Sequence, residues 1–71
     1  MPKRLRVLAK ELRELGYELE KPSSGSHWRV RKDGRMYPIP AHNAGNTEIP
    51  DIYLRKLAEF LGYDADKFLP K

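Results

Sequence analysis

One histidine lies among arginines in a stretch where polar and apolar residues alternate. The order is His27, Trp28, Arg29, Val30 and Arg31, and residues two apart in a strand point to the same side. His27, Arg29 and Arg31 are therefore expected on one face of a strand. A guanidinium group can bind phosphate oxygens through two parallel hydrogen bonds, and an imidazole can exchange a proton near neutral pH. The pattern favours a phosphodiester ligand and makes His27 the candidate acid or base.

The neighbourhood of His27 offers further candidates. Gly25 and Ser26 would let a backbone approach the imidazole, and Lys32 would add positive charge. If Leu19 pairs with Trp28, Glu20 lies opposite His27 and its carboxylate would favour the imidazolium form. The alternative is that His27 simply begins a strand at the edge of a loop.

His42 is the second imidazole of the chain and lies in a loop after the third expected strand. That loop should return towards the end of the sheet where His27 begins. His42 is therefore either a second acid or base and a phosphate contact, or an ordinary loop residue.

Other common sites do not fit the sequence. There is no cysteine, which excludes disulfides and thiolate metal sites and suits a reducing cytoplasm. Asp64 and Asp66 lack the glycine and the terminal glutamate of a calcium loop. The serines between Pro22 and His27 form no Ser-His-Asp arrangement at a known spacing. We therefore expect no metal and no cofactor.

Length and charge narrow the function further. The 71 residues (1–71) are enough for one domain with a thin core, so an active site should lie on an open face. Fourteen Lys and Arg against ten Asp and Glu give a net charge of +4, which favours acidic or phosphate-bearing partners such as RNA. No apolar run is long enough for a membrane span or a signal core.

The elements that must position these residues follow from periodicity. Leucines three and four apart predict an amphipathic helix over 3–15, with Lys3, Arg6, Lys10 and Arg13 on its solvated side. Alternation predicts strands over 17–20 and 27–31, and Asp33-Gly34 is a preferred two-residue hairpin turn. This turn pairs Lys32 with Arg35 and Trp28 with Ile39. Pro38 and Pro40 predict that the third strand is an edge strand or ends near Ile39.

The remainder of the chain is expected to be a long polar loop over 41–48, a helix over 50–61 and a last turn capped by Asp64, with Phe68 closing the core. The fold class is α+β, in the order α-β-β-β-α. Both helices should cover one face of a three-stranded antiparallel sheet. The open face should carry Glu18, Glu20, His27, Arg29, Arg31 and Met36.

Several short motifs in this order resemble the HicA toxin family, the ribonucleases of bacterial and phage toxin-antitoxin pairs. The resemblance covers nearly the whole chain and ends with Gly62 and Phe68. The motifs are Leu15-Gly16-Tyr17, Gly25-Ser26-His27, Asp33-Gly34-Arg35, Pro40-Ala41-His42 and Leu54-Arg55-Lys56-Leu57. The sequence departs from the family at Ile52-Tyr53, where a Gly-Thr pair is usual, and in the loop over 43–47. Those departures leave RNA contacts at the second helix and target preference open.

The resemblance implies a fold like the double-stranded RNA-binding domain, metal-independent cleavage of mRNA and a catalytic histidine at the Gly-Ser-His position, which is His27. It also implies a cytoplasmic protein, monomeric or bound to a HicB-like antitoxin. Two alternatives remain: a non-catalytic module that binds double-stranded RNA, and a domain that docks an acidic protein. The first predicts salt-dependent RNA binding without cleavage, and the second predicts no RNA affinity.

Overall fold

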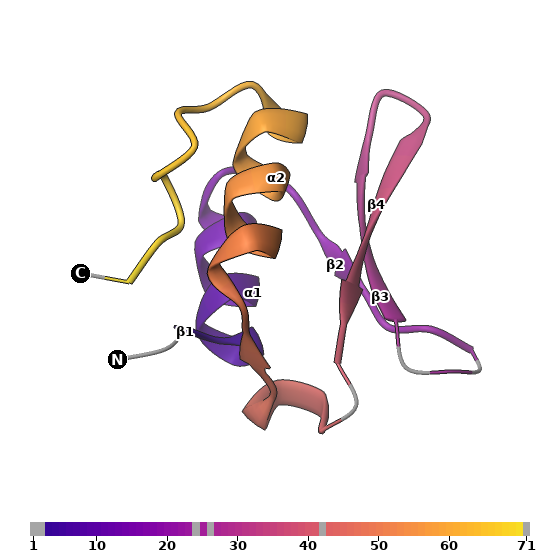
Figure 1. Cartoon of the computed structure of the whole chain (residues 1–71). Helices are drawn as coiled ribbons and strands as arrows, with labels where there is room; N and C mark the ends of the chain where they lie inside the picture. The colour runs from indigo at the N-terminus through magenta and orange to yellow at the C-terminus, as the bar shows by residue number, and fades with distance from the viewer. Residues whose placement is uncertain (1–2, 24, 26, 42, 71) are drawn as a thin grey trace.

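The computed structural model describes residues 3–23, 25, 27–41 and 43–70 and shows an α+β fold (Figure 1). Two antiparallel sheets and two helices make up the described part of the chain. The elements are β1 (Lys3–Arg4), α1 (Leu5–Glu14), β2 (Leu19–Glu20), β3 (His27–Lys32), β4 (Arg35–Pro40), the short 3-10 helix η1 (Ala44–Asn46), β5 (Glu48–Ile49) and α2 (Asp51–Leu61).

The β3–β4 hairpin has the predicted register. Trp28 pairs with Ile39 and Lys32 pairs with Arg35, on either side of the turn at Asp33-Gly34. Asp33 and Gly34 have φ values of 51° and 79°, which is the left-handed conformation that a two-residue hairpin turn requires. The larger sheet has the order β2-β3-β4, so β4 is an edge strand as expected.

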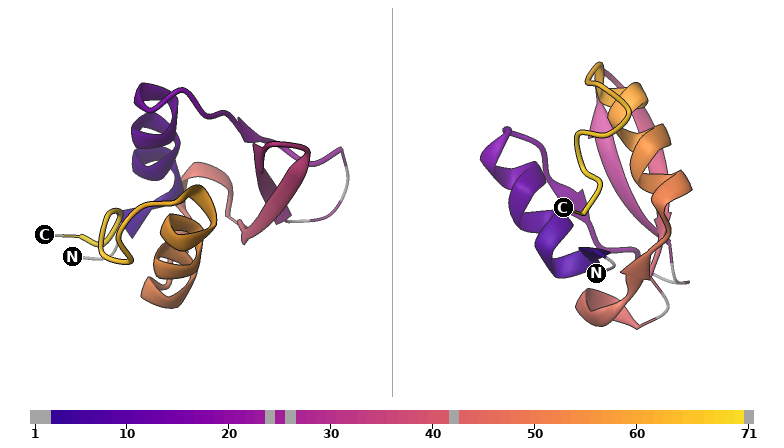
Figure 2. Two further views of the ribbon diagram at one scale, coloured as in Figure 1. Left: turned by 90° about the horizontal axis from the view of Figure 1, so that it is seen from above. Right: turned by 60° about the vertical axis from the view of Figure 1, so that its left-hand side comes forward.

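Both helices cover the same face of the larger sheet, and the two views in Figure 2 show the sheet as a separate layer. Val30 and Ile39 are fully buried against leucines from both helices. Each helix contributes residues three or four apart, which is the spacing of one helix face. The buried helix residues are Leu5, Leu8 and Leu12 from α1 and Leu54, Leu57, Ala58 and Leu61 from α2.

Several predictions about the N-terminus, the loop after β4 and β2 are wrong in detail. Lys3 and Arg4 form β1 and not the first turn of the helix, and β1 pairs with β5, which begins at Glu48, the last residue of the segment expected to be a polar loop. Lys3 consequently faces inward, is 8% exposed and pairs with Glu11. A strand of two residues has no measurable alternation, so periodicity cannot reveal it. β2 is likewise shorter than predicted and begins at Leu19.

The residues after α2 close the core. Gly62 ends the helix with a φ of 88°, and the amide of Lys67 donates to the carbonyl oxygen of Asp64 in the following turn. The turn brings Phe68 between the helices, where it is 1% exposed and meets Tyr63 edge to face at 6.3 Å between ring centroids. The predicted closure of the core by Phe68 is confirmed.

The position of the prolines in β4 follows from the hairpin register. Lys32 and Arg35 flank the two-residue turn and form a hydrogen-bonded pair, so Tyr37 and Ile39 also bond to β3. Pro38 and Pro40 lie at the alternate positions, whose amide side points away from β3. A proline there removes no bond from the ladder and leaves the outer edge short of donors.

Replacing Pro38 with threonine should therefore restore an outward N–H donor at this edge. We expect the fold to be retained and self-association to increase, because an edge strand with free donors can pair with a second strand. Sedimentation velocity at rising protein concentration measures the effect. An unchanged monomer fraction in the P38T variant would contradict this role of the proline.

Among the described residues, no helix has the length and apolar character needed to cross a bilayer.

Candidate phosphate-binding surface

The open face of the larger sheet presents His27, Arg29 and Arg31 together. All three belong to β3 and are exposed, whereas the intervening Trp28 and Val30 pack towards the core. The strand places every second residue on the same side, so the three polar side chains form a row along β3. This is the arrangement expected from the sequence.

Arg31 is held by a carboxylate from the neighbouring strand. Its Nε donates to Glu20 Oε2 at 2.9 Å and its NH2 donates to Oε1 at 3.3 Å. Both side chains remain largely exposed, at 55% for Arg31 and 40% for Glu20. The two parallel bonds orient the guanidinium group, but solvent screening keeps the contribution of such a pair to stability small.

The expected contact between Glu20 and His27 is wrong. Leu19 pairs with Val30 and not with Trp28, so Glu20 lies opposite Arg29. The register differs from the predicted one by two residues. His27 lies beyond the end of β2, and its cross-strand partner on the other side is Pro40 of β4. Glu20 therefore lies beside Arg29 and accepts hydrogen bonds from Arg31, and it does not face His27.

The hydrogen bond from Arg31 lowers the pKa of Glu20, and the positive charges of Arg31 and Arg29 act in the same direction. The same pair raises the pKa of Arg31. A folded-state pKa below the unfolded one stabilises the fold above the unfolded pKa, and this stabilisation is lost as the pH falls through the folded value. At neutral pH the ion pair is therefore complete.

An NMR titration of the Glu20 side-chain carboxyl carbon should have a midpoint below the usual value for glutamate. The R31Q variant should move that midpoint upward, because the main cause of the shift is removed. A Glu20 midpoint that is the same in both proteins would contradict the pairing.

Lys32 does not join the row. It follows Arg31 and therefore points to the helix side of the sheet, where its Nζ donates to the carbonyl oxygen of Leu61 at 2.9 Å. A cation at this position satisfies one of the carbonyl groups that the C-terminal end of α2 leaves without a helical partner. The structure thus gives Lys32 a role in joining the hairpin to α2, away from the predicted phosphate contacts.

Two of the predicted site residues, Ser26 and His42, lie outside the described residues. Of the other residues expected on the open face, Met36 is 44% exposed and lies opposite Arg31 on β4. It gives the face an apolar element beside the arginines.

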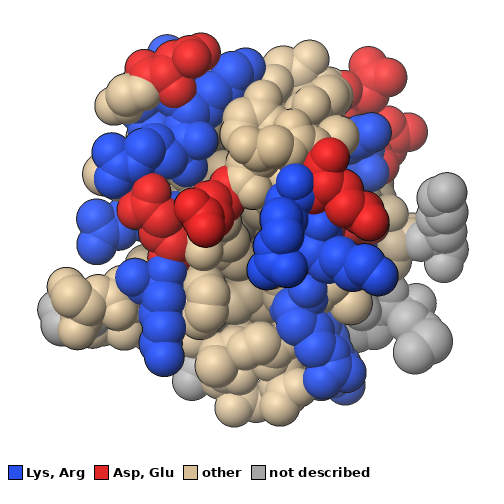
Figure 3. Space-filling model, turned by 180° about the vertical axis from the view of Figure 1, so that it is seen from behind, with Lys and Arg blue, Asp and Glu red and all other residues tan. Residues whose placement is uncertain are grey.

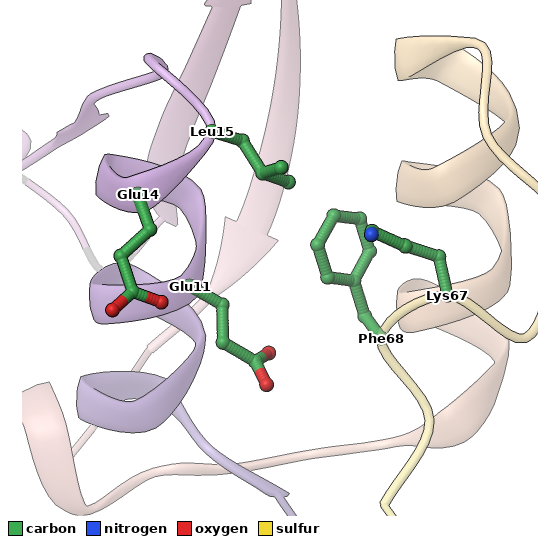
Figure 4. A pocket seen from close by; sticks show the side chains of 5 residues that line it. All are labelled: Glu11, Glu14, Leu15, Lys67 and Phe68. Carbon is green, nitrogen blue, oxygen red and sulfur yellow. The ribbon is translucent and has the colours of Figure 1, made fainter.

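Two hollows in the described part of the chain lie away from the row on β3. One is lined by Lys32, Asp33, Arg35 and Phe60 beside the hairpin turn. The other, of about 240 Å³, lies between α1 and the C-terminal turn, where Glu11, Glu14, Leu15, Lys67 and Phe68 surround it (Figure 4). Because His27, Arg29 and Arg31 are exposed, the candidate site is an open surface, as expected for a domain of this size.

Within residues 3–23, 25, 27–41 and 43–70, no group of three or more His, Cys, Asp or Glu side chains is arranged to hold a metal ion. Comparisons with protein-family models, curated proteins and solved structures find no match to this chain. The function is therefore inferred from the chemistry of the exposed row and from the sequence motifs.

Proposed function

We propose that the protein is a metal-independent endoribonuclease in which His27 is the general acid or base. The observation that carries the proposal is the row of His27, Arg29 and Arg31 on the exposed face of β3. An imidazole beside two guanidinium groups combines proton transfer with binding of a developing negative charge. Few substrates other than a phosphodiester need both a proton-transfer group and a cation at an open surface.

The spacing of the row suits an extended RNA strand. Alternate residues of a strand are about 6.6 Å apart, which is comparable to the separation of neighbouring phosphates in an extended nucleic-acid chain. With the scissile phosphate between His27 and Arg29, the next phosphate of the strand would lie near Arg31. Glu20 holds the guanidinium of Arg31 in place and so reduces the conformational entropy lost on binding.

In the proposed reaction a nitrogen of His27 removes the proton of a ribose 2′-hydroxyl group. The O2′ atom attacks the adjacent phosphorus, a new O2′–P bond forms and the P–O5′ bond breaks. The leaving O5′ takes a proton from water, so the products are a 2′,3′-cyclic phosphate and a 5′-hydroxyl end. Arg29 is the nearest cation of the row along β3 and would stabilise the additional negative charge on the phosphate.

The motifs shared with the HicA family support the same function, because His27 occupies the position of that family's catalytic histidine. On this basis we also propose mRNA as the substrate, a HicB-like antitoxin as the protein partner and the cytoplasm as the location. The net charge of +4 agrees with an RNA ligand.

Purified protein should cleave an RNA oligonucleotide in the presence of EDTA and leave cyclic phosphate ends. The same oligonucleotide with 2′-O-methyl riboses should remain intact, because the attacking hydroxyl is blocked. Mass spectrometry of the fragments identifies the ends. Cleavage that requires Mg²⁺ or leaves 5′-phosphates would contradict the mechanism. Salt-dependent binding without cleavage would instead favour the non-catalytic RNA-binding module, and absence of binding would favour a protein-docking domain.

A further inference from the structure

We infer a second phosphate-binding point, separate from the row on β3, formed by Arg4 and Arg6 and positioned by Asn46. Its ligand would be a backbone phosphate of the RNA strand that reaches His27, so the inference rests on the proposed function. Nothing in the sequence motifs assigns a role to these three residues.

Both arginines are oriented by a single residue. Arg4 NH1 donates to the main-chain oxygen of Asn46 at 3.2 Å, and Arg6 NH1 donates to its side-chain Oδ1 at 3.1 Å. All three residues are exposed. Each bond uses one of the five N–H donors of a guanidinium group, so the other donors stay available to a ligand.

The segment that carries Asn46 is firmly attached to the rest of the fold. Thr47 is 3% exposed, its carbonyl oxygen accepts from the amide of Leu5 at 2.8 Å and its hydroxyl accepts from the amide of Asn43 at 2.8 Å. η1 also lies close against α1, because a Cβ atom built on Gly45 would be 3.4 Å from the Cβ of Arg6. Asn46 is therefore a fixed acceptor, and the two arginines are held by a rigid part of the backbone.

The electrostatics of this pair differ from those of Arg31. Arg31 is neutralised by Glu20, whereas Asn46 is uncharged and leaves the full positive charge on both guanidinium groups. Glu48 is the cross-strand neighbour of Arg4, yet among the described residues no carboxylate forms an ion pair with Arg4 or Arg6. Two oriented and uncompensated guanidinium groups are suited to an anion with several acceptor oxygens.

The position of the pair relative to His27 suits one continuous strand. His27 lies opposite Pro40 at the end of β4, and η1 begins at Ala44. Figure 1 shows the start of β3, the end of β4, η1 and the start of α1 at the same lower end of the molecule. In the view from behind, basic side chains gather in two groups with acidic side chains among them, one group lying over α1 (Figure 3).

The test uses a fluorescent 2′-O-methyl oligoribonucleotide, which binds without being cleaved, and measures its fluorescence anisotropy at several salt concentrations. The double variant R4Q/R6Q should weaken binding about tenfold, which corresponds to about 1.4 kcal/mol. The slope of log K against log salt should become shallower by about 0.7 for each phosphate of a single strand that the variant no longer neutralises. N46A keeps all charges and should weaken binding by a smaller factor.

The matched control is R55Q/K56Q, which removes two exposed charges from α2. Equal weakening by this control and by R4Q/R6Q would overturn the inference, because only net charge would then matter. N46A binding that equals wild type would overturn the positioning role of Asn46. If the wild type cleaves RNA and R4Q/R6Q binds RNA as tightly as the wild type does, the second phosphate-binding point is wrong and the nuclease proposal stands. If R4Q/R6Q binds RNA more weakly but the wild type does not cleave RNA, the nuclease proposal is wrong and the second phosphate-binding point stands.

Discussion

Replacing His27 with alanine is expected to lower the rate of RNA cleavage in EDTA by a factor of about 100 or more, since a positioned acid or base contributes about 10²–10⁴. Arg29 and Arg31 remain in the variant, so RNA should still bind. His27 is exposed on β3, so the fold should be unaffected by the substitution. Single-turnover kinetics with a labelled oligonucleotide measure the chemical step directly.

H27N is the companion variant, because asparagine keeps a polar side chain but cannot exchange a proton near neutral pH. It should be as inactive as H27A. H42A tests whether the second imidazole takes part, and an active H42A would make His42 an ordinary loop residue. Equal rates for wild type, H27A and H27N would remove His27 from the mechanism and would point to a contaminating nuclease.

Replacing Phe68 with alanine is expected to destabilise the fold by about 3–5 kcal/mol, the usual cost of removing a buried aromatic ring. Phe68 is 1% exposed and contacts Tyr63, and the ammonium of Lys3 lies 5.9 Å from its ring centroid. At about 0.05–0.15 kcal/mol per residue, 71 residues provide on the order of 4–11 kcal/mol in total. One side chain thus supports a large part of the stability.

Urea denaturation followed by far-UV circular dichroism measures this destabilisation. Leu69→Ala, one residue along and only partly buried, is the matched control and should have a much smaller effect. F68L keeps an apolar side chain and should lie between the two, which preserves the comparison if F68A does not fold. Equal midpoints for F68A and Leu69→Ala would show that the C-terminal turn does not complete the core.

The hairpin and the open face can be predicted from the sequence because a local signal determines them. Asp33-Gly34 specifies the turn, the turn specifies the register, and the register places His27, Arg29 and Arg31 on one side. Leucine spacing likewise predicts both helices to within two residues at each end. The candidate row on β3 is therefore predictable in full.

The pairing of β2 with β3 cannot be predicted in the same way. A shift of two residues leaves every side chain on its original face, so alternation cannot distinguish the pairing of Leu19 with Val30 from that with Trp28. Six residues separate the two strands, so no two-residue hairpin turn determines their register. The predicted partner of Glu20 is wrong for this reason.

The remaining errors have similarly physical causes. β1 and β5 are too short for a periodic pattern, so the inward position of Lys3 has no sequence signal. The contacts of Arg4 and Arg6 with Asn46 join residues that are 42 and 40 positions apart and depend on that small sheet. The error at Lys32 is of a different kind, because the sequence does contain the signal. The alternation that turns His27 outward also turns Lys32 towards the helices.

The bond from Lys32 to Leu61 has a mechanical consequence for the proposed nuclease. At its far end the hairpin is joined to the last turn of α2, and in its middle β3 pairs with β2 on one side and with β4 on the other. β3 is thus anchored at its middle by β2 and at its far end by Lys32. When an RNA strand binds to the outer face of β3, these anchors should keep the backbone in place, so that His27, Arg29 and Arg31 retain their spacing.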